Sequence, residues 1–173
     1  MGTILRDLQR VRWTRLQAAK ESTARAVPAL LSKAAWSDRD TARQAVDELG
    51  DLVCELGLVM QEATAPTVPF LTELAGAPHV SCRTEALELL QKIFAGRQWS
   101  AASQAFSSRH DTHLARQVAW EKSAQESVLA GRHVFEILAT SVDPVVARAA
   151  AKLLQPFADH DQQSAGAKER GDK

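Results

Sequence analysis

The chain has 173 residues with 21 basic and 21 acidic side chains, so its formal net charge is zero. Hydrophobic residues make up 45% of the sequence, which is enough for a buried core and excludes global disorder. Balanced charge argues against a dedicated nucleic-acid binder, and 30 alanines with no tyrosine favour packed helices over sheets.

The first predicted element is an amphipathic helix over residues 3–22. Its apolar residues recur at helical spacing: Ile4, Leu5, Leu8, Val11, Leu16 and Ala19. A second helix is expected over residues 24–35. Pro28 lies near the start of that second helix, where its missing N–H leaves no hydrogen bond unmade. The two helices would lie at the N-terminal end of the domain.

A third helix is predicted over residues 41–56, with Asp38 or Asp40 as its N-cap and Gly57 just beyond its C-terminus. Its apolar face comprises Ala42, Ala45, Val46, Leu49, Val53 and Leu56. The spacing of these residues matches one side of an α-helix, so we expect them to face the core.

Two further helices follow in the middle of the chain. The fourth is predicted over residues 67–75, with Pro69 in its first turn and a Gly-Ala-Pro stop behind it. The fifth is predicted over residues 81–94 and closed by Gly96. Its expected core residues are Ala86, Leu87, Leu90 and Ile93. The apolar residues of the fifth helix recur at helical spacing, so we expect them to face the core.

The last third of the chain alternates between loops and helices. Residues 97–112 are rich in serine and predict a loop with at most a short helical turn. A long helix is expected over 113–140 with a bend at Gly131, and a last helix over 144–158. Residues 159–173 are small and charged, which predicts a disordered tail behind a single domain over residues 1–158.

Three segments of the chain align as an internal repeat. They are AVPALLSKAAWSDRDTARQAVDELGDL, TVPFLTELAGAPHVSCRTEALELLQKI and HVFEILATSVDPVVARAAAKLLQPF. Each contains a short apolar helix, a turn and a second helix that carries an arginine. The step from Arg43 to Arg83 is 40 residues, and the step from Arg83 to Arg148 is 65. The first step falls at the lower end of the roughly 40–47-residue period of HEAT and armadillo units.

These segments resemble HEAT repeats. DRDTARQAVDELGDL and DPVVARAAAKLLQPF are similar to the second helix of a HEAT repeat, whereas residues 79–82 depart from its Asp-rich turn. The stretches 57–71 and 120–157 are similar to a group of HEAT-repeat proteins from actinobacteria and related soil bacteria. The resemblance covers residues 25–158. It implies an all-α, right-handed superhelix of about three HEAT-like helical pairs behind an N-terminal capping helix.

Two short motifs contain residues that could bind metal or act as nucleophiles. His110 and His113 form a His-x-x-His pair beside Asp111, but a metal site needs three or four ligands and no partner pair has a recognised spacing. His79 and Cys82 form a His-x-x-Cys pattern without an orienting third group. We therefore predict no metal, no cofactor and no catalytic residues, and we lean against an enzyme.

The zero net charge conceals two oppositely charged segments. Residues 1–35 hold seven basic and two acidic side chains, whereas residues 36–62 hold two basic and seven acidic ones. The first predicted helix offers a basic face that includes Arg12 and, beside it, Trp13. This face is either a contact surface for an acidic partner or an ordinary solvated face.

The aromatic residues near the serine-rich loop suggest a binding site. A tryptophan in a loop, such as Trp99, serves either local packing or binding. The crease between this loop and the long helix could form a pocket. The candidate binding residues are Trp99, Phe106, Arg109, His110, His113, Arg116, Trp120, Arg12 and Trp13.

Three functions are consistent with this sequence. The leading hypothesis is a non-enzymatic scaffold that recognises a protein partner through its concave face and the 97–112 loop. The alternatives are a DNA-binding or glycosylase-like repair protein, and a small-molecule binding, biosynthetic or self-resistance protein. No signal peptide and no apolar stretch long enough for a membrane span are present, so we expect a cytoplasmic protein with two buried thiols, Cys54 and Cys82.

Overall fold

The protein is mostly helical, as predicted, in a computed structural model that describes residues 4–55, 59–105 and 112–170. Four short 3-10 helices come first: η1 (Arg6–Arg10), η2 (Trp13–Arg15), η3 (Ala19–Glu21) and η4 (Ala24–Ala26). The longer helices are α1 (Val27–Trp36), α2 (Arg39–Val53), α3 (Thr64–Gly76), α4 (Arg83–Ala95), α5 (Gln98–Ala105), α6 (Thr112–Ala130), α7 (Arg132–Ala139) and α8 (Pro144–Arg170). Strands β1 (Cys54–Glu55) and β2 (Val59–Met60) form a small antiparallel ladder between α2 and α3.

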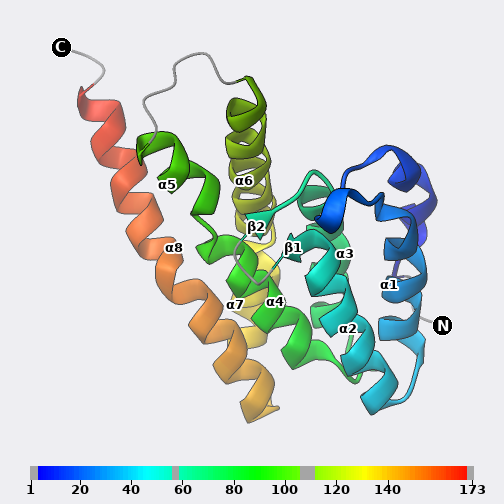
Figure 1. The fold of residues 1–173 in the computed structure, drawn as a ribbon. Coiled ribbons are helices and arrows are strands. Elements are labelled where there is room, and N and C mark those ends of the chain that lie inside the picture. Colours follow the sequence, from blue (N-terminus) through cyan, green and yellow to red (C-terminus); the bar gives the residue numbers. More distant parts are fainter. Residues whose placement is uncertain (1–3, 56–58, 106–111, 171–173) are drawn as a thin grey trace.

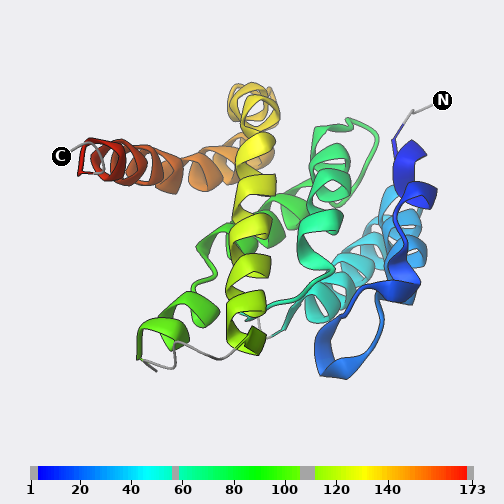
Figure 2. The same ribbon diagram turned by 90° about the horizontal axis from the view of Figure 1, so that it is seen from above.

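The helices pack in two rows. Helix α1 packs on α2, α3 on α4 and α7 on α8, so that three antiparallel pairs form (Figures 1 and 2). Helices α2, α4 and α8 make one row, because α4 contacts both α2 and α8. Helix α3 contacts α1, α6 and α7, which completes the other row. Among the described helices, none is long and apolar enough to cross a membrane.

The core lies between the two rows and follows the apolar patterns of the sequence. In α2 the buried residues include Ala42, Ala45, Val46, Leu49 and Val53, as predicted. In α4 they include Ala86, Leu87, Leu90 and Ile93. Asp38 is confirmed as the N-cap of α2, since its Oδ1 accepts a hydrogen bond of 3.1 Å from the Thr41 amide. The predicted roles of Leu56 and Gly57 lie outside the described residues.

The predicted N-terminal helix is wrong. Residues 4–26 form the short segments η1 to η4, and the backbone φ is positive at Leu5 (64°) and Lys20 (58°). Side chains from α3 and the segment before it hold this backbone: the Leu5 amide donates to Glu73 Oε2 and the Gln17 amide donates to Glu62 Oε2. These tertiary hydrogen bonds replace helical ones, so the cap of the first helix pair is not itself an α-helix.

Helix α3 begins earlier than predicted. Thr64 stabilises this start, because its hydroxyl accepts from the Gln61 amide at 2.8 Å and donates to the Val53 carbonyl. Pro69 therefore lies inside the helix rather than in its first turn. The bend expected at Gly131 is a break between α6 and α7. A Cβ on Gly131 would lie 2.8 Å from Cζ of the buried Phe135, so only glycine fits this close approach.

Two predictions for the second half of the chain are also wrong. Residues 98–105, which we expected in a loop, form α5. The last helix does not end at residue 158 but continues to Arg170 through the expected disordered tail. A contact with α7 stabilises the turn of α8 that directly follows residue 158. Arg132 forms a two-pronged ion pair with Asp161, with both N···O distances 2.9 Å.

Candidate functional site

The two N-terminal candidates, Arg12 and Trp13, differ in solvent exposure. Trp13 is buried, its indole N–H donates to the Leu8 carbonyl at 2.8 Å, and its ring tilts against Phe70 with the centroids 5.9 Å apart. It therefore belongs to the core and not to a binding surface. Arg12 beside it is exposed. The basic side chains of this segment project from irregular 3-10 segments rather than from one helical face.

Trp99 is anchored to the fold. Its indole N–H donates to the Met60 carbonyl on β2 at 2.9 Å, and its side chain is half-buried. This hydrogen bond joins the first turn of α5 to the β-ladder. Of the two roles that the sequence left open for Trp99, the contacts fit local packing.

A buried glutamate that sequence reasoning missed holds α5 in place. Glu121 on α6 is only 1% exposed and accepts hydrogen bonds from the amides of Trp99 (2.9 Å) and Ser100 (3.3 Å) and from the Ser100 hydroxyl. It thus caps the first turn of α5 from another helix. One signal was present in the sequence, since Glu121 shares a helical face with the buried residues Ala124 and Val128.

The remaining candidates on the C-terminal side are placed on α6. Trp120 is half-buried, and His113 and Arg116 are exposed. Phe106, Arg109 and His110 lie outside the described residues. A pocket formed by the α6 residues together with Phe106, Arg109 and His110 therefore stays a prediction. No group of three or more histidine, cysteine, aspartate or glutamate residues in the described part of the chain could hold a metal ion.

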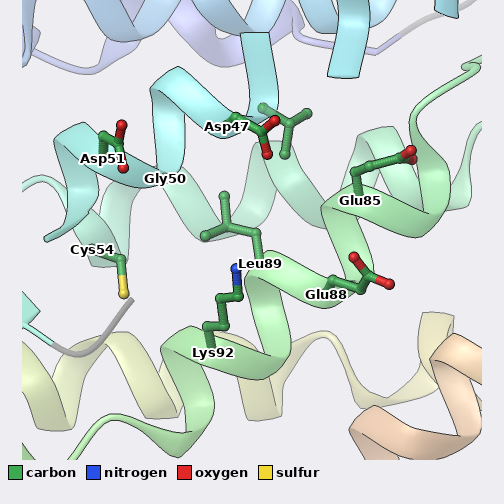
Figure 3. Close-up of a pocket in the computed structure, with 9 residues that line it drawn as sticks. Asp47, Gly50, Asp51, Cys54, Glu85, Glu88, Leu89 and Lys92 are labelled. Carbon is green, nitrogen blue, oxygen red and sulfur yellow. The ribbon is translucent and has the colours of Figure 1, made fainter. Parts of the chain in front are cut away.

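The structure reveals a groove between α2 and α4 that the sequence did not identify (Figure 3). It has a volume of about 280 Å³. Its lining residues come from one side of each helix: Val46, Asp47, Gly50, Asp51 and Cys54 from α2 and β1, and Glu85, Glu88, Leu89 and Lys92 from α4. Thus each helix contributes two carboxylates to one groove.

The floor of this groove depends on Gly50. A Cβ at this position would lie 3.3 Å from Cδ1 of Leu89, closer than ordinary van der Waals contact. Glycine therefore lets α2 approach the Leu89 side chain on α4. Leu89 is 6% exposed and provides an apolar base beneath the charged rim.

The charges of the groove are not neutralised within the described residues. The lining residues include four carboxylates, those of Asp47, Asp51, Glu85 and Glu88, and one ammonium group, that of Lys92. None of these five side chains forms an ion pair of 4.0 Å or less with another described residue. The groove thus presents an excess of negative charge around an apolar floor, which is suited to a ligand that carries positive charge.

The two cysteines are buried free thiols, as predicted. Burial raises the pKa of Cys54 to about 11, against a smaller lowering by Lys92. Burial and then Glu85 raise the pKa of Cys82 to about 11, and its thiol donates to the Ala34 carbonyl at 3.3 Å. His79 stacks on Trp36 with the ring centroids 5.2 Å apart. These contacts do not form an activated thiol–imidazole pair.

We expect both thiols to resist alkylation. With a pKa near 11, only about one thiol in a thousand is ionised at pH 8, so iodoacetamide should modify the native protein at least about 100-fold more slowly than the protein in 6–8 M urea. Because folding raises these pKa values, the folded state binds the thiol protons more tightly. The corresponding stability is complete below about pH 8.5 and is lost as the pH rises toward 11.

Mass spectrometry of timed samples measures this reaction at each cysteine. The urea-unfolded chain is the control, because it gives the rate of the unprotected thiols. Modification of native Cys54 or Cys82 at that rate would contradict the burial described above.

Comparison with known proteins gives no relative for this architecture. No family model, no curated protein and no solved structure matches the chain. The function must therefore be argued from the groove and from the surfaces of the helix pairs.

Proposed function

We propose that this protein is a non-enzymatic binding module with a HEAT-like superhelix, and that the groove between α2 and α4 recognises a basic segment of a protein partner. Three helix pairs with corresponding helices in adjacent rows support the HEAT-like part of the proposal. Relative to such an array, α6 is an additional helix beside α3. The segment of η1 to η4 takes the place of the expected capping helix.

The single observation that carries the proposal is the unneutralised acidic rim over an apolar floor. Four carboxylates from two helices surround Leu89, and Lys92 is the cation among them. A peptide with alternating cationic and apolar side chains would satisfy both features, since guanidinium groups pair with carboxylates and apolar groups cover the leucine. A phosphate backbone would be repelled by the same rim.

The proposed recognition surface is the α2–α4 groove, whereas the sequence analysis expected the concave face and the 97–112 loop. The indole N–H of Trp99 is used in a hydrogen bond to the Met60 carbonyl. Part of the 97–112 segment lies outside the described residues. The groove therefore supports binding better than the serine-rich segment does. It lies in the α2, α4 and α8 row, which we propose as the partner-facing side.

The test uses a fluorescein-labelled peptide of alternating arginine and leucine and the full chain, with binding followed by fluorescence anisotropy. The double variant Asp47→Lys with Glu88→Lys should weaken binding by about tenfold or more, because two attractions become repulsions. The same peptide with glutamate in place of arginine should bind at least about tenfold more weakly to the unmodified protein.

A matched charge change elsewhere separates the groove from net charge. Glu136→Lys with Asp159→Lys alters two exposed carboxylates on α7 and α8 by the same total charge. This control should change the affinity by no more than about twofold at 0.15 M salt. Equal weakening by both double variants would show that the peptide senses only overall charge, and the groove proposal would then fail.

A further inference from the structure

The turns that connect the helices of each pair lie along one edge of the molecule, at the bottom of Figure 1. Among the described residues, the large apolar side chains that are mostly exposed are Trp36, Ile137, Val142 and Val145. Three of them lie on this edge: Trp36 precedes the first turn, and Val142 and Val145 flank the start of α8. Val142 is fully exposed and Trp36 is 58% exposed. Two of the three turns thus carry mostly exposed apolar side chains.

A pocket joins the three turns into one surface. It has a volume of about 320 Å³, and α2, the α3–α4 turn and the start of α8 all contribute to its lining. Pro78 and Val145 give it apolar walls. His79, next to Pro78, stacks on Trp36 with an interplanar angle of 19°. Apolar or aromatic side chains therefore occur at all three turns, and the polar lining of the pocket lies between them.

The charges of this pocket are complementary to a carboxylate. Asp143 is already engaged, because its Oδ1 accepts from the amides of Val145 (2.9 Å) and Val146 (3.3 Å) at the start of α8. Arg83 donates Nε to the Ala75 carbonyl at 2.9 Å, which leaves its terminal amino groups for another acceptor. The Arg39 side chain forms no ion pair with the described residues. Two guanidinium groups thus line the pocket without a carboxylate partner among them.

We propose that this turn edge, defined by Trp36, Arg39, Pro78, Arg83, Val142 and Val145, docks a protein segment in which an acidic side chain lies beside apolar ones. The carboxylate would pair with the two arginines, and the apolar side chains would cover Trp36 and Val145. Tryptophan and arginine are the residue types that most often dominate the energy of protein interfaces. The exposed valines Val142 and Val145 give no stacking surface for bases, and His79 already covers one face of the Trp36 ring, which favours a protein occupant over a single-stranded nucleic acid.

The turn edge is independent of the α2–α4 groove, since it attracts the opposite charge and shares no lining residue with it. The probe is a labelled peptide of alternating leucine and aspartate, titrated against the full chain. Trp36→Ala and Arg39→Glu should each weaken its binding by about tenfold or more. Peptides with lysine in place of aspartate, or serine in place of leucine, should bind at least about tenfold more weakly.

Two control variants make the result specific. Arg25→Glu changes an exposed arginine on η4 by the same charge, and Asp47→Lys changes only the groove. Both should leave binding of the leucine–aspartate peptide within about twofold. Because Asp47→Lys weakens the groove alone, a failure of one proposal is distinguishable from a failure of the other. Circular dichroism verifies that each variant is folded.

Three results would overturn the turn-edge proposal. The first is the absence of binding at millimolar protein, or binding that Trp36→Ala and Arg39→Glu do not change. The second is binding of a single-stranded oligonucleotide that both variants abolish, which would identify a nucleic-acid surface. The third is a concentration-dependent dimer in sedimentation velocity that Trp36→Ala dissociates, which would identify a second copy of this chain as the occupant.

Discussion

Replacing Phe157 with alanine is expected to lower the free energy of unfolding by about 3–5 kcal/mol. The side chain is 2% exposed and joins α8 to two other helices. Its ring lies 4.6 Å from the Phe94 ring on α4 and 6.3 Å from the Phe135 ring on α7, measured between centroids. Truncation would remove both aromatic contacts and leave a cavity at the only place where all three helices meet through rings in the described residues.

Urea denaturation followed by far-UV circular dichroism measures this loss. Phe157→Leu fills part of the cavity and should lose less stability than Phe157→Ala. Gln155→Ala is the matched control, because Gln155 is exposed on the same helix and its removal should change stability by no more than about 0.5 kcal/mol. A loss below about 1 kcal/mol for Phe157→Ala would show that α8 is not firmly packed on α4 and α7.

The helix pairs were predictable because their sequences are locally consistent. In α2 and α4 the apolar residues recur at helical spacing, and the same residues are buried in the structure. Asp38 at the start of α2 and Gly96 at the end of α4 also act where the sequence places them. Periodicity and caps are properties of neighbouring residues, so they can be read without knowledge of the tertiary fold.

The N-terminal segment and α5 were not predictable in this way. The pattern of Leu5 and Leu8 fits a helix, but hydrogen bonds from this backbone to Glu62 and Glu73 favour another conformation. Conversely, the serine-rich sequence of α5 has little periodicity, and its first turn is capped by Glu121 from α6. In both cases residues distant in the sequence decide the local structure, which a local pattern cannot reveal.

The candidate site was predictable only in part. The acidic character of residues 36–62 was clear, and this segment supplies Asp47 and Asp51. That Glu85 and Glu88 face them depends on the way α4 crosses beside α2, and on the missing side chain at Gly50. The pocket of the turn edge was not predictable, because Pro78 and Val145 line it together only when the third helix pair lies beside the second.

Replacing Glu121 with alanine is expected to release the first turn of α5 and to lower the free energy of unfolding by about 2–3 kcal/mol. The carboxylate is buried and accepts from two amides and one hydroxyl at that turn. Alanine would leave these donors without an acceptor in a partly buried place. The loss of stability has an upper limit, because α5 can unfold locally and let the amides of residues 98–105 form hydrogen bonds with water.

Hydrogen exchange and urea denaturation together distinguish these effects. Exchange should accelerate in residues 98–105 of Glu121→Ala, whereas the amides of α2 and α4 should retain their protection. Glu126→Ala is the control on the same helix, because Glu126 is exposed and forms an exposed ion pair with Lys122 at 3.8 Å.

The variant Glu121→Gln separates the charge from the acceptor function. Glutamine keeps one carbonyl oxygen for the amides of α5 but replaces the other oxygen with a donor, so it should protect residues 98–105 less than glutamate and more than alanine. Native-like protection of residues 98–105 in Glu121→Ala would mean that another contact suffices to hold the helix. The hydrogen bond from the Trp99 indole to the Met60 carbonyl would then be the anchor, and Trp99→Phe should release α5 instead.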